Sequence, residues 1–209
     1  MKKVSLLILA LLLSATLVAQ VRVACIGNSI TYGSGIKDRV HDTYPAQLQV
    51  LLGDGYEVRN FGVSGCTAQR DGDKPWTQMK EYEEAKAFLP QVAVIKLGTN
   101  DTKPQNWKGS EPFIHDLEAL AHEFEALPSH PQIIIALPAT AYQVKWGIRD
   151  SVIRAGELKP ICKMAKRNGW RLVDLHKATA GMPERFPDGI HPDPQGAGVI
   201  ARKIRGAIK

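Results

Sequence analysis

Short β-rich runs alternate with helical stretches through most of this chain of 209 residues, from residue 21 onward. Because each strand run is followed by a helix, the strands are expected to lie parallel in one sheet with helices on both faces. The pattern predicts an α/β fold, a three-layer α/β/α sandwich around a five-stranded parallel sheet. The predicted strands are Val21–Ile26, Tyr56–Phe61, Val92–Leu97, Ile133–Leu137 and Trp170–Leu175.

The helices between these strands are predicted from their caps and apolar stripes. Asp193 is placed to cap the last helix, and Pro194 follows in its first turn. Apolar residues recur every three or four positions over residues 113–127, which puts them on one helix face. Further helices are expected over Pro45–Leu52, with Asp42 or Thr43 as cap, over Thr77–Phe88, and from about Pro160 to Gly169.

The first twenty residues have the composition of an export signal. A lysine-containing start precedes the apolar run Leu6–Leu13, which is typical of a secretory signal peptide. We expect cleavage after Ala19 or Gln20, which leaves residues 21–209 as one domain of an exported protein, periplasmic or secreted. The alternative is a membrane anchor, but the apolar stretch Val4–Ala19 has only 16 residues, whereas a membrane-spanning helix needs about 20.

Charge and cysteine content exclude several classes of partner. The formal net charge of +6 becomes +4 once Lys2 and Lys3 are removed with the signal. The chain lacks the basic runs of nucleic-acid-binding proteins, so no nucleic-acid partner is expected. Cys25, Cys66 and Cys162 can form at most one disulfide, and buried free thiols are the default interpretation. No cluster of cysteine and histidine suggests a metal site, and no cofactor is expected.

Three predicted strands are followed by residues that can take part in catalysis. Ligands of parallel sheets gather beyond the carboxyl ends of the strands. Ser29 follows the first strand, and it is either a nucleophile or a helix cap. Gly62 follows the second, where a glycine can bring a backbone N–H close to a ligand or simply make a turn. Asn100 follows the third, where its amide can donate a hydrogen bond or close a turn.

A histidine near the C-terminus completes this set. Asp188 stands three residues before His191 in a loop bounded by prolines. In that arrangement the carboxylate can accept the Nδ1–H of the histidine and leave Nε2 free as a base. The alternatives are an ordinary surface histidine, or a metal site made of Asp188, His191 and Asp193.

Together these residues supply a nucleophile, an oriented base and oxyanion donors, which are the parts of an acyl-transfer site. In these blocks the chain resembles the SGNH hydrolases, the GDSL-like lipase/esterase superfamily. The resemblance extends over essentially all of residues 21–209. Asn28 replaces the aspartate of the Gly-Asp-Ser motif, a change that leaves the serine chemistry intact. The matching blocks are Gly27–Thr31, Gly62, Gly98–Asp101 and Asp188–Pro192.

The resemblance implies the flavodoxin-like SGNH hydrolase fold and ester hydrolysis through an acyl-enzyme, with no cofactor. Ser29 would be the nucleophile, His191 the base and Asp188 the residue that orients the base. The N–H groups of Ser29 and Gly62 and the side-chain amide of Asn100 would form the oxyanion hole.

The substrate is inferred from a finer resemblance. The segments 60–65 and 98–104 are similar to exported bacterial acetylesterases of carbohydrates, including sialate O-acetylesterases, which implies acetyl esters on a small-molecule or oligosaccharide substrate. A lipase, lysophospholipase or thioesterase of the same superfamily is the enzymatic alternative, and a catalytically silent carbohydrate-binding protein is the non-enzymatic one. Four aromatic residues near the predicted rim can contact a sugar or cap the core, namely Trp76, Trp107, Tyr142 and Trp146.

The loops around the predicted site carry more basic than acidic residues, an excess that can attract an anionic sugar or be solvated at the surface. The acidic residues are Asp71, Asp73 and Asp101. The basic residues are Arg70, Lys74, Lys103, Lys108, Lys145 and Arg149.

Overall fold

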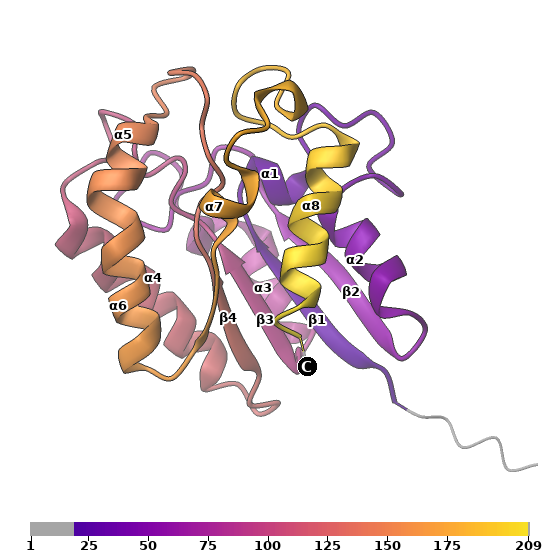
Figure 1. The fold of residues 1–209 in the computed structure, drawn as a ribbon. Coiled ribbons are helices and arrows are strands. Elements are labelled where there is room, and N and C mark those ends of the chain that lie inside the picture. Colours follow the sequence, from indigo (N-terminus) through magenta and orange to yellow (C-terminus); the bar gives the residue numbers. More distant parts are fainter. Residues whose placement is uncertain (1–18, 209) are drawn as a thin grey trace, which may run out of the picture.

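Five strands form one parallel sheet in the computed structural model, which describes residues 19–208 (Figure 1). The strand order is β2-β1-β3-β4-β5, which is the flavodoxin-like order with its switch point between β1 and β3. The predicted fold class is confirmed. Residues 1–18 of the predicted signal peptide lie outside the described part of the chain. The strands are β1 Val21–Gly27, β2 Tyr56–Gly62, β3 Val92–Lys96, β4 Gln132–Ala136 and β5 Arg171–Val173.

Helices cover both faces of this sheet (Figure 1). One face carries α1 Ser29–Tyr32, α2 Tyr44–Leu52, α7 Leu175–Thr179 and α8 Pro194–Arg205. The opposite face carries α3 Lys80–Ala87, α4 Ser110–Glu125 and α6 Leu158–Arg167. The short elements are the 3₁₀ turns Trp76–Gln78 and Pro183–Arg185, the helix α5 Asp150–Val152 and the π-helical segment Ile153–Glu157.

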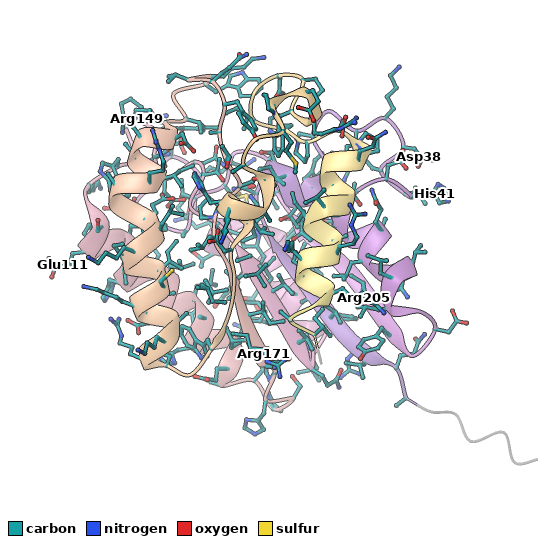
Figure 2. The ribbon with its side chains drawn as sticks, viewed as in Figure 1. Asp38, His41, Glu111, Arg149, Arg171 and Arg205 are labelled. Carbon is teal, nitrogen blue, oxygen red and sulfur yellow. The ribbon has the colours of Figure 1, made fainter. Side chains whose placement is uncertain are left out.

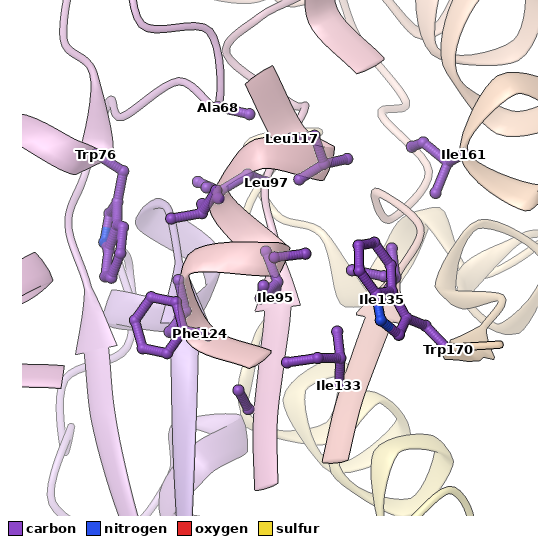
Figure 3. Close-up of a cluster of buried hydrophobic side chains, with 14 of the residues drawn as sticks. Ala68, Trp76, Ile95, Leu97, Leu117, Phe124, Ile133, Ile135, Ile161 and Trp170 are labelled. Atoms are coloured by element: carbon purple, nitrogen blue, oxygen red, sulfur yellow. The ribbon is translucent and has the colours of Figure 1, made fainter. Parts of the chain in front are cut away.

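The core is divided by the sheet into two apolar clusters. β3 lies at the centre of the sheet and all its residues are buried. Its alternate side chains point to opposite faces, so Val94 joins the cluster beneath α2 and α8, whereas Ile95 joins the one beneath α4. Figure 3 shows the latter cluster, in which Leu117 and Phe124 of α4 pack over the strands.

The predicted caps are confirmed, but some helix bounds differ. Thr43 caps α2 rather than Asp42, and the Asp193 side chain caps α8 by accepting a hydrogen bond from Gly196 N at 2.8 Å. The single helix predicted over Thr77–Phe88 is divided, because Met79 adopts an extended conformation (φ −89°, ψ 152°) between a 3₁₀ turn and α3. The helix predicted from Pro160 begins two residues earlier, directly after the π-helical segment, which the sequence pattern did not indicate.

The loops that follow the strands gather at one end of the sheet (Figure 1). Figure 2 shows Asp38 and Arg149 at that end and Arg171, at the start of β5, at the opposite end. The three cysteines are free thiols. Within residues 19–208, no helix has the length and apolar character that crossing a bilayer requires.

Candidate active site

Two glycines allow the first helix to sit directly on the ends of β1 and β2. A Cβ atom on Gly27 would lie 2.1 Å from Thr31 Oγ1, and one on Gly62 would lie 2.2 Å from the backbone nitrogen of Tyr32. Neither position tolerates a side chain, so α1 approaches the sheet edge closely. Ser29, the first residue of α1, is thereby held at the carboxyl end of the sheet with 6% of its surface exposed.

Ser29, His191 and Asp188 form a continuous chain of hydrogen bonds. Ser29 Oγ lies 2.8 Å from His191 Nε2, and His191 Nδ1 lies 2.7 Å from Asp188 Oδ2. Because a carboxylate can only accept, Nδ1 carries the proton and Nε2 accepts the hydroxyl hydrogen of Ser29. These contacts join residues 162 positions apart in the sequence.

The environment of Asp188 favours its ionised form. Its Oδ1 accepts hydrogen bonds from Ile190 N at 2.8 Å and His191 N at 2.7 Å. Partial burial raises the pKa of this carboxyl, but the hydrogen bonds from the backbone and ring of His191 outweigh burial, so the pKa lies below its usual value. The carboxylate is therefore charged and oriented toward the imidazole.

A second Asp-x-x-His segment adopts the same local geometry on the surface. Asp38 Oδ1 accepts the N–H groups of Val40 and His41, and Asp38 Oδ2 lies 2.8 Å from His41 Nδ1. Both side chains are exposed, at 53% for Asp38 and 76% for His41 (Figure 2). No hydroxyl of the described residues bonds to the His41 ring. The three-residue spacing is sufficient to produce the Asp–His contact. The tertiary fold brings a serine within hydrogen-bonding distance of only one of the two histidines.

Gly62 is not available as the expected oxyanion donor, so that prediction is wrong. Its N–H donates to Asn60 Oδ1 at 2.9 Å, while Asn60 Nδ2 donates to Thr31 O at 2.7 Å. Gly62 therefore makes room for α1, and Asn60 anchors α1 to β2. Both are structural roles in support of Ser29.

Gly65, three residues further along, fits the donor role that Gly62 was expected to fill. It has φ +87°, a left-handed conformation that favours glycine, and its N–H donates to no acceptor among residues 19–208. The hydroxyls of Ser64 and Ser34 lie 2.7 Å apart, which places this loop against the end of α1. The only sequence signal for Gly65 was a second glycine in the same loop.

Asn100 and Asp101 clamp this loop to the turn after β3. Asn100 Nδ2 donates to Cys66 O at 3.0 Å, which uses one of its two amide hydrogens. The carboxylate of Asp101 accepts the N–H groups of Ala68 at 3.1 Å and Gln69 at 2.8 Å. Burial raises the pKa of Asp101 to about 7. The structure thus brings Asn100 and the Gly65 loop together, and the contact between Ser64 and Ser34 places this loop against the end of α1.

Of the four aromatic residues expected at the rim, Trp146 lies beside the histidine. This residue is 55% exposed, and its ring centroid is 5.2 Å from that of His191. For Trp76 the sugar-contact alternative is wrong and the core alternative holds, because this side chain is fully buried and donates from Nε1 to Phe61 O. Trp107 packs partly buried against the core, and the ring of Tyr142 lies tilted against that of Phe186.

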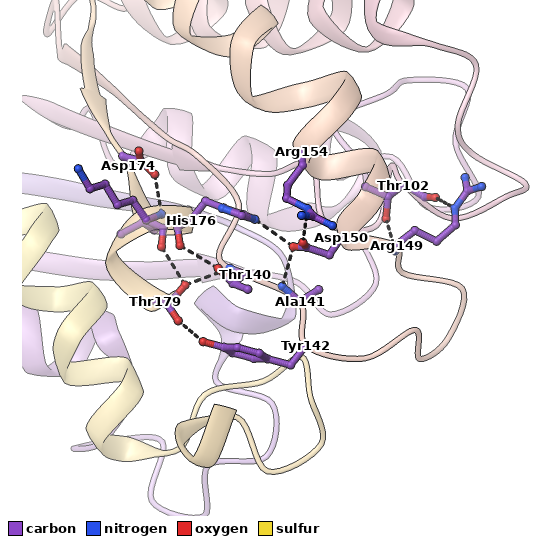
Figure 4. A network of polar contacts seen from close by, with 12 residues as sticks. Thr102, Thr140, Ala141, Tyr142, Arg149, Asp150, Arg154, Asp174, His176 and Thr179 are labelled. Carbon is purple, nitrogen blue, oxygen red and sulfur yellow. Dashed lines mark hydrogen bonds and ion pairs between the residues drawn. The ribbon is translucent and has the colours of Figure 1, made fainter. Parts of the chain in front are cut away.

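The loop that carries Trp146 is fixed at both ends (Figure 4). At its C-terminal end, Asp150 Oδ1 accepts Ala141 N at 3.1 Å and lies 3.0 Å from His176 Nε2. Arg149 N donates to Thr102 Oγ1 at 3.0 Å. Tyr142 N also donates to Gly189 O at 2.8 Å, which ties this loop to the one that carries Asp188 and His191.

Half of the six basic residues of the loops are paired with carboxylates. Arg70 pairs with Glu123, Lys108 with Asp71, and Lys103 with Asp73. Arg149 Nε donates to a backbone carbonyl, and Asp101 is buried. Near the serine, Lys74 donates to Ser64 O, and the Lys145 ammonium lies 4.7 Å from the Trp146 ring centroid.

The metal-site alternative has no support from the geometry. Asp193 is used as the cap of α8 and lies 3.5 Å from Arg185 Nη1, so it does not converge on His191 with Asp188. Residues 19–208 contain no cluster of three potential histidine, cysteine, aspartate or glutamate ligands.

Comparisons with known proteins agree with the fold and blocks described above. The chain is 42% identical to an acetylxylan esterase of Xylanibacter ruminicola, over 90% of this chain and 43% of that protein, so it spans less than half of the relative's length. Among solved structures, a putative arylesterase from Agrobacterium tumefaciens has 21% identity and a TM-score of 0.73, covering 90% of this chain and 97% of the other. A carbohydrate acetylesterase from Sinorhizobium meliloti has 17% identity and a TM-score of 0.69, with 90% and 97% covered.

These structural likenesses show the shared fold. A family model described as the GDSL-like Lipase/Acylhydrolase family matches residues 25–199, which include all the blocks around Ser29 and His191. The chain therefore belongs to the GDSL-like lipase/acylhydrolase family.

Proposed function

We propose that the protein is a serine esterase that removes acetyl groups from carbohydrates through an acyl-enzyme. The observation that carries this proposal is the chain of hydrogen bonds from Ser29 through His191 to Asp188, at 2.8 and 2.7 Å. A serine hydroxyl bonded to an oriented imidazole is the arrangement that acyl transfer requires. The likeness to an acetylxylan esterase supports an acetylated sugar as substrate.

In the proposed reaction, Ser29 Oγ attacks the ester carbonyl carbon while His191 Nε2 takes the hydroxyl proton. The tetrahedral intermediate collapses as His191 gives that proton to the sugar oxygen, which leaves with the sugar and leaves the acetyl group on Ser29. Water then attacks the acyl-enzyme while His191 accepts one of its protons. The second tetrahedral intermediate collapses as His191 returns that proton to Ser29 Oγ, which restores the serine and releases acetic acid, ionised to acetate at neutral pH. Asp188 stabilises the imidazolium that forms in both steps.

Three donors are proposed to stabilise the oxyanion. The N–H of Ser29 has no partner within its helix, because it is the first helical residue. The N–H of Gly65 replaces that of Gly62 in this role. The second amide hydrogen of Asn100 is the third donor, since the first is bonded to Cys66 O. Preorganised donors of this kind are usually the largest single contribution to such catalysis.

Trp146 is proposed as the platform on which the sugar ring rests. An indole offers a large apolar face at low conformational cost, and this one is exposed next to the base. Lys145 lies over the same ring and adds a positive charge at the rim. A sugar on Trp146 would present an acetyl ester to Ser29 across the His191 ring.

We also propose that the apolar segment before β1 directs export. The support is the run Leu6–Leu13 followed by the small residues Ser14, Ala15, Thr16 and Ala19 before the start of the sheet. Sequencing the N-terminus of the mature protein recovered from outside the cytoplasm tests this proposal. The expected first residue is Gln20 or Val21, and an intact Met1 would refute it.

Labelling with a fluorophosphonate tests the nucleophile. We expect one label on Ser29 in the wild type and none in S29A, which should also have lost its esterase activity. Absence of labelling in a folded wild type that still binds sugars would identify a carbohydrate-binding protein instead.

Acetate release tests the substrate class. Acetylated xylan, acetylated pectin fragments and O-acetyl sialic acids would be compared with p-nitrophenyl esters of increasing chain length and with an acyl thioester. The proposal predicts highest turnover with acetyl esters and a higher KM on oligosaccharides for W146A. A rate that rises with acyl length would identify a lipase or lysophospholipase.

A further inference from the structure

Two side chains of opposite charge are buried at the carboxyl end of the sheet, outside the proposed catalytic set. Lys96 is the last residue of β3, and Glu157 ends the π-helical segment between α5 and α6. Both have 0% of their surface exposed. Lysine and glutamate are almost never fully buried unless they are paired, because removing a charge from water costs free energy.

Lys96 is linked to the proposed nucleophile, Ser29, through Asn28. Its Nζ donates to Asn28 Oδ1 at 3.3 Å, and the same oxygen accepts the N–H of Ile30 at 3.2 Å. Asn28 is itself fully buried and directly precedes Ser29. Its Nδ2 has no acceptor among the described residues. Two hydrogen bonds to Oδ1 therefore hold this side chain, and Lys96 supplies one of them.

The strand pairing fixes where the ammonium lies. Lys96 is the partner of Gly27 in the β1–β3 ladder, so β3 carries the lysine directly beside the turn from β1 into α1. That turn contains Asn28 and Ser29.

Glu157 supplies the opposite charge at the same end of the sheet. Its two carboxyl oxygens accept no hydrogen bond from residues 19–208, and a Cβ on Gly98 would lie 3.0 Å from Oε2. Burial, and then the charge of Asp101, raise the pKa of Glu157 well above its usual value, while Lys96 acts in the opposite direction. Burial lowers the pKa of Lys96 to about 7, and Glu157 opposes that shift. Each group thus opposes the shift that burial causes in the pKa of the other, although the two side chains are not hydrogen-bonded to each other.

We propose that Lys96 is a buried positioning residue for the esterase reaction. Lys96 holds the Asn28 amide and so fixes the turn that presents Ser29 to His191, and Glu157 is a buried residue of opposite charge type at the same end of the sheet. The inference rests on the proposed function, because it concerns turnover at Ser29. Apolar residues of similar volume would fill the same space without the cost of burying charge, so the fold itself does not require this pair.

The double variant K96M/E157Q tests this inference, since it removes both charges and leaves no unpaired ion. We expect kcat on a short acyl ester to fall about tenfold, less than the roughly 10²–10³-fold loss that follows removal of a direct oxyanion donor. KM should stay within about twofold, because neither residue contacts the substrate. The melting temperature should be unchanged or higher, since the buried charges are gone.

A double-mutant cycle tests the route through Asn28. In an N28A background, adding K96M/E157Q should cause no further loss of kcat, because the group that Lys96 positions is already absent. An additional tenfold loss in that background would show that Lys96 does not act through Asn28 and would overturn the inference.

V94A is the matched control, because Val94 is fully buried on the same face of β3, two residues before Lys96. It should lower the melting temperature without changing kcat. Wild-type kcat in K96M/E157Q would overturn the inference, as would a failure of that variant to fold, since the pair would then be needed for the structure itself. A wild type inactive on every acyl ester would instead overturn the proposed function.

Discussion

Replacing Asp188 by asparagine is the substitution whose outcome the structure specifies most closely. The amide oxygen in D188N can take the place of Oδ1 and keep the hydrogen bonds from Ile190 N and His191 N. The amide NH₂ then faces His191 Nδ1, where the carboxylate Oδ2 accepted a hydrogen bond at 2.7 Å. Because an NH₂ group can only donate, Nδ1 must become an acceptor and the ring proton moves to Nε2.

In that tautomer Nε2 directs an N–H at Ser29 Oγ and cannot take the hydroxyl proton. We therefore expect kcat to fall by a factor of about 10⁴, which corresponds to about 5 kcal/mol of transition-state stabilisation. Stability should change much less, by about 1 kcal/mol, because residue 188 keeps its three hydrogen bonds and loses only the negative charge that strengthens them. The assay is Michaelis kinetics on p-nitrophenyl acetate together with the free energy of unfolding in urea.

The chain contains its own control for this experiment. Asp38 and His41 share the local geometry of Asp188 and His191 but have no serine partner. D38N makes the same chemical change in the same motif and should leave kcat unaltered. The reasoning is refuted if D188N keeps more than about a tenth of wild-type kcat, or if D38N lowers kcat as D188N does.

The remaining predictions concern the donor, the cap and the thiols. N100A should lower kcat by roughly 10²–10³ with little change in KM, which steady-state kinetics would measure, and an unchanged kcat would remove Asn100 from the oxyanion hole. D193A should lose about 1 kcal/mol of stability with the helix cap and keep kcat within twofold, so a variant of normal melting temperature and low kcat would contradict the assignment. Burial raises the pKa of Cys25 and of Cys66 to about 12, so neither should react with a disulfide reagent in neutral buffer until the protein is unfolded, and rapid native-state labelling of either would contradict this burial.

Much of this fold and site was readable from local patterns. The alternation of strands and helices predicted the parallel sheet, because side-chain periodicity reports which face of an element is buried. Ser29, Asn100 and the Asp188–His191 pair were found because each follows a strand or precedes the last helix. The caps Thr43 and Asp193 were found because capping is a contact within a few residues.

The errors arose where the outcome depended on which contacts a residue makes in the folded protein. Gly62 was expected as a donor because it follows a predicted strand, and the bond from Gly62 N to Asn60 Oδ1 shows that its N–H is already used. Trp76 was expected at the rim because it follows a strand, but the core between the sheet and α4 buries it. The charged residue of β3, Lys96, passed unnoticed within an apolar run.

By itself the sequence determined the sheet, its helical layers and the residue types that meet at its carboxyl end, because periodicity and capping act between near neighbours. It also determined both Asp-x-x-His contacts, since three residues suffice to return a carboxylate to a ring nitrogen. Only the tertiary structure decided which histidine is hydrogen-bonded to a serine, and which charged side chain is buried beside the turn that carries Ser29. Those outcomes depend on how residues far apart in the chain are packed, and no local pattern contains that information.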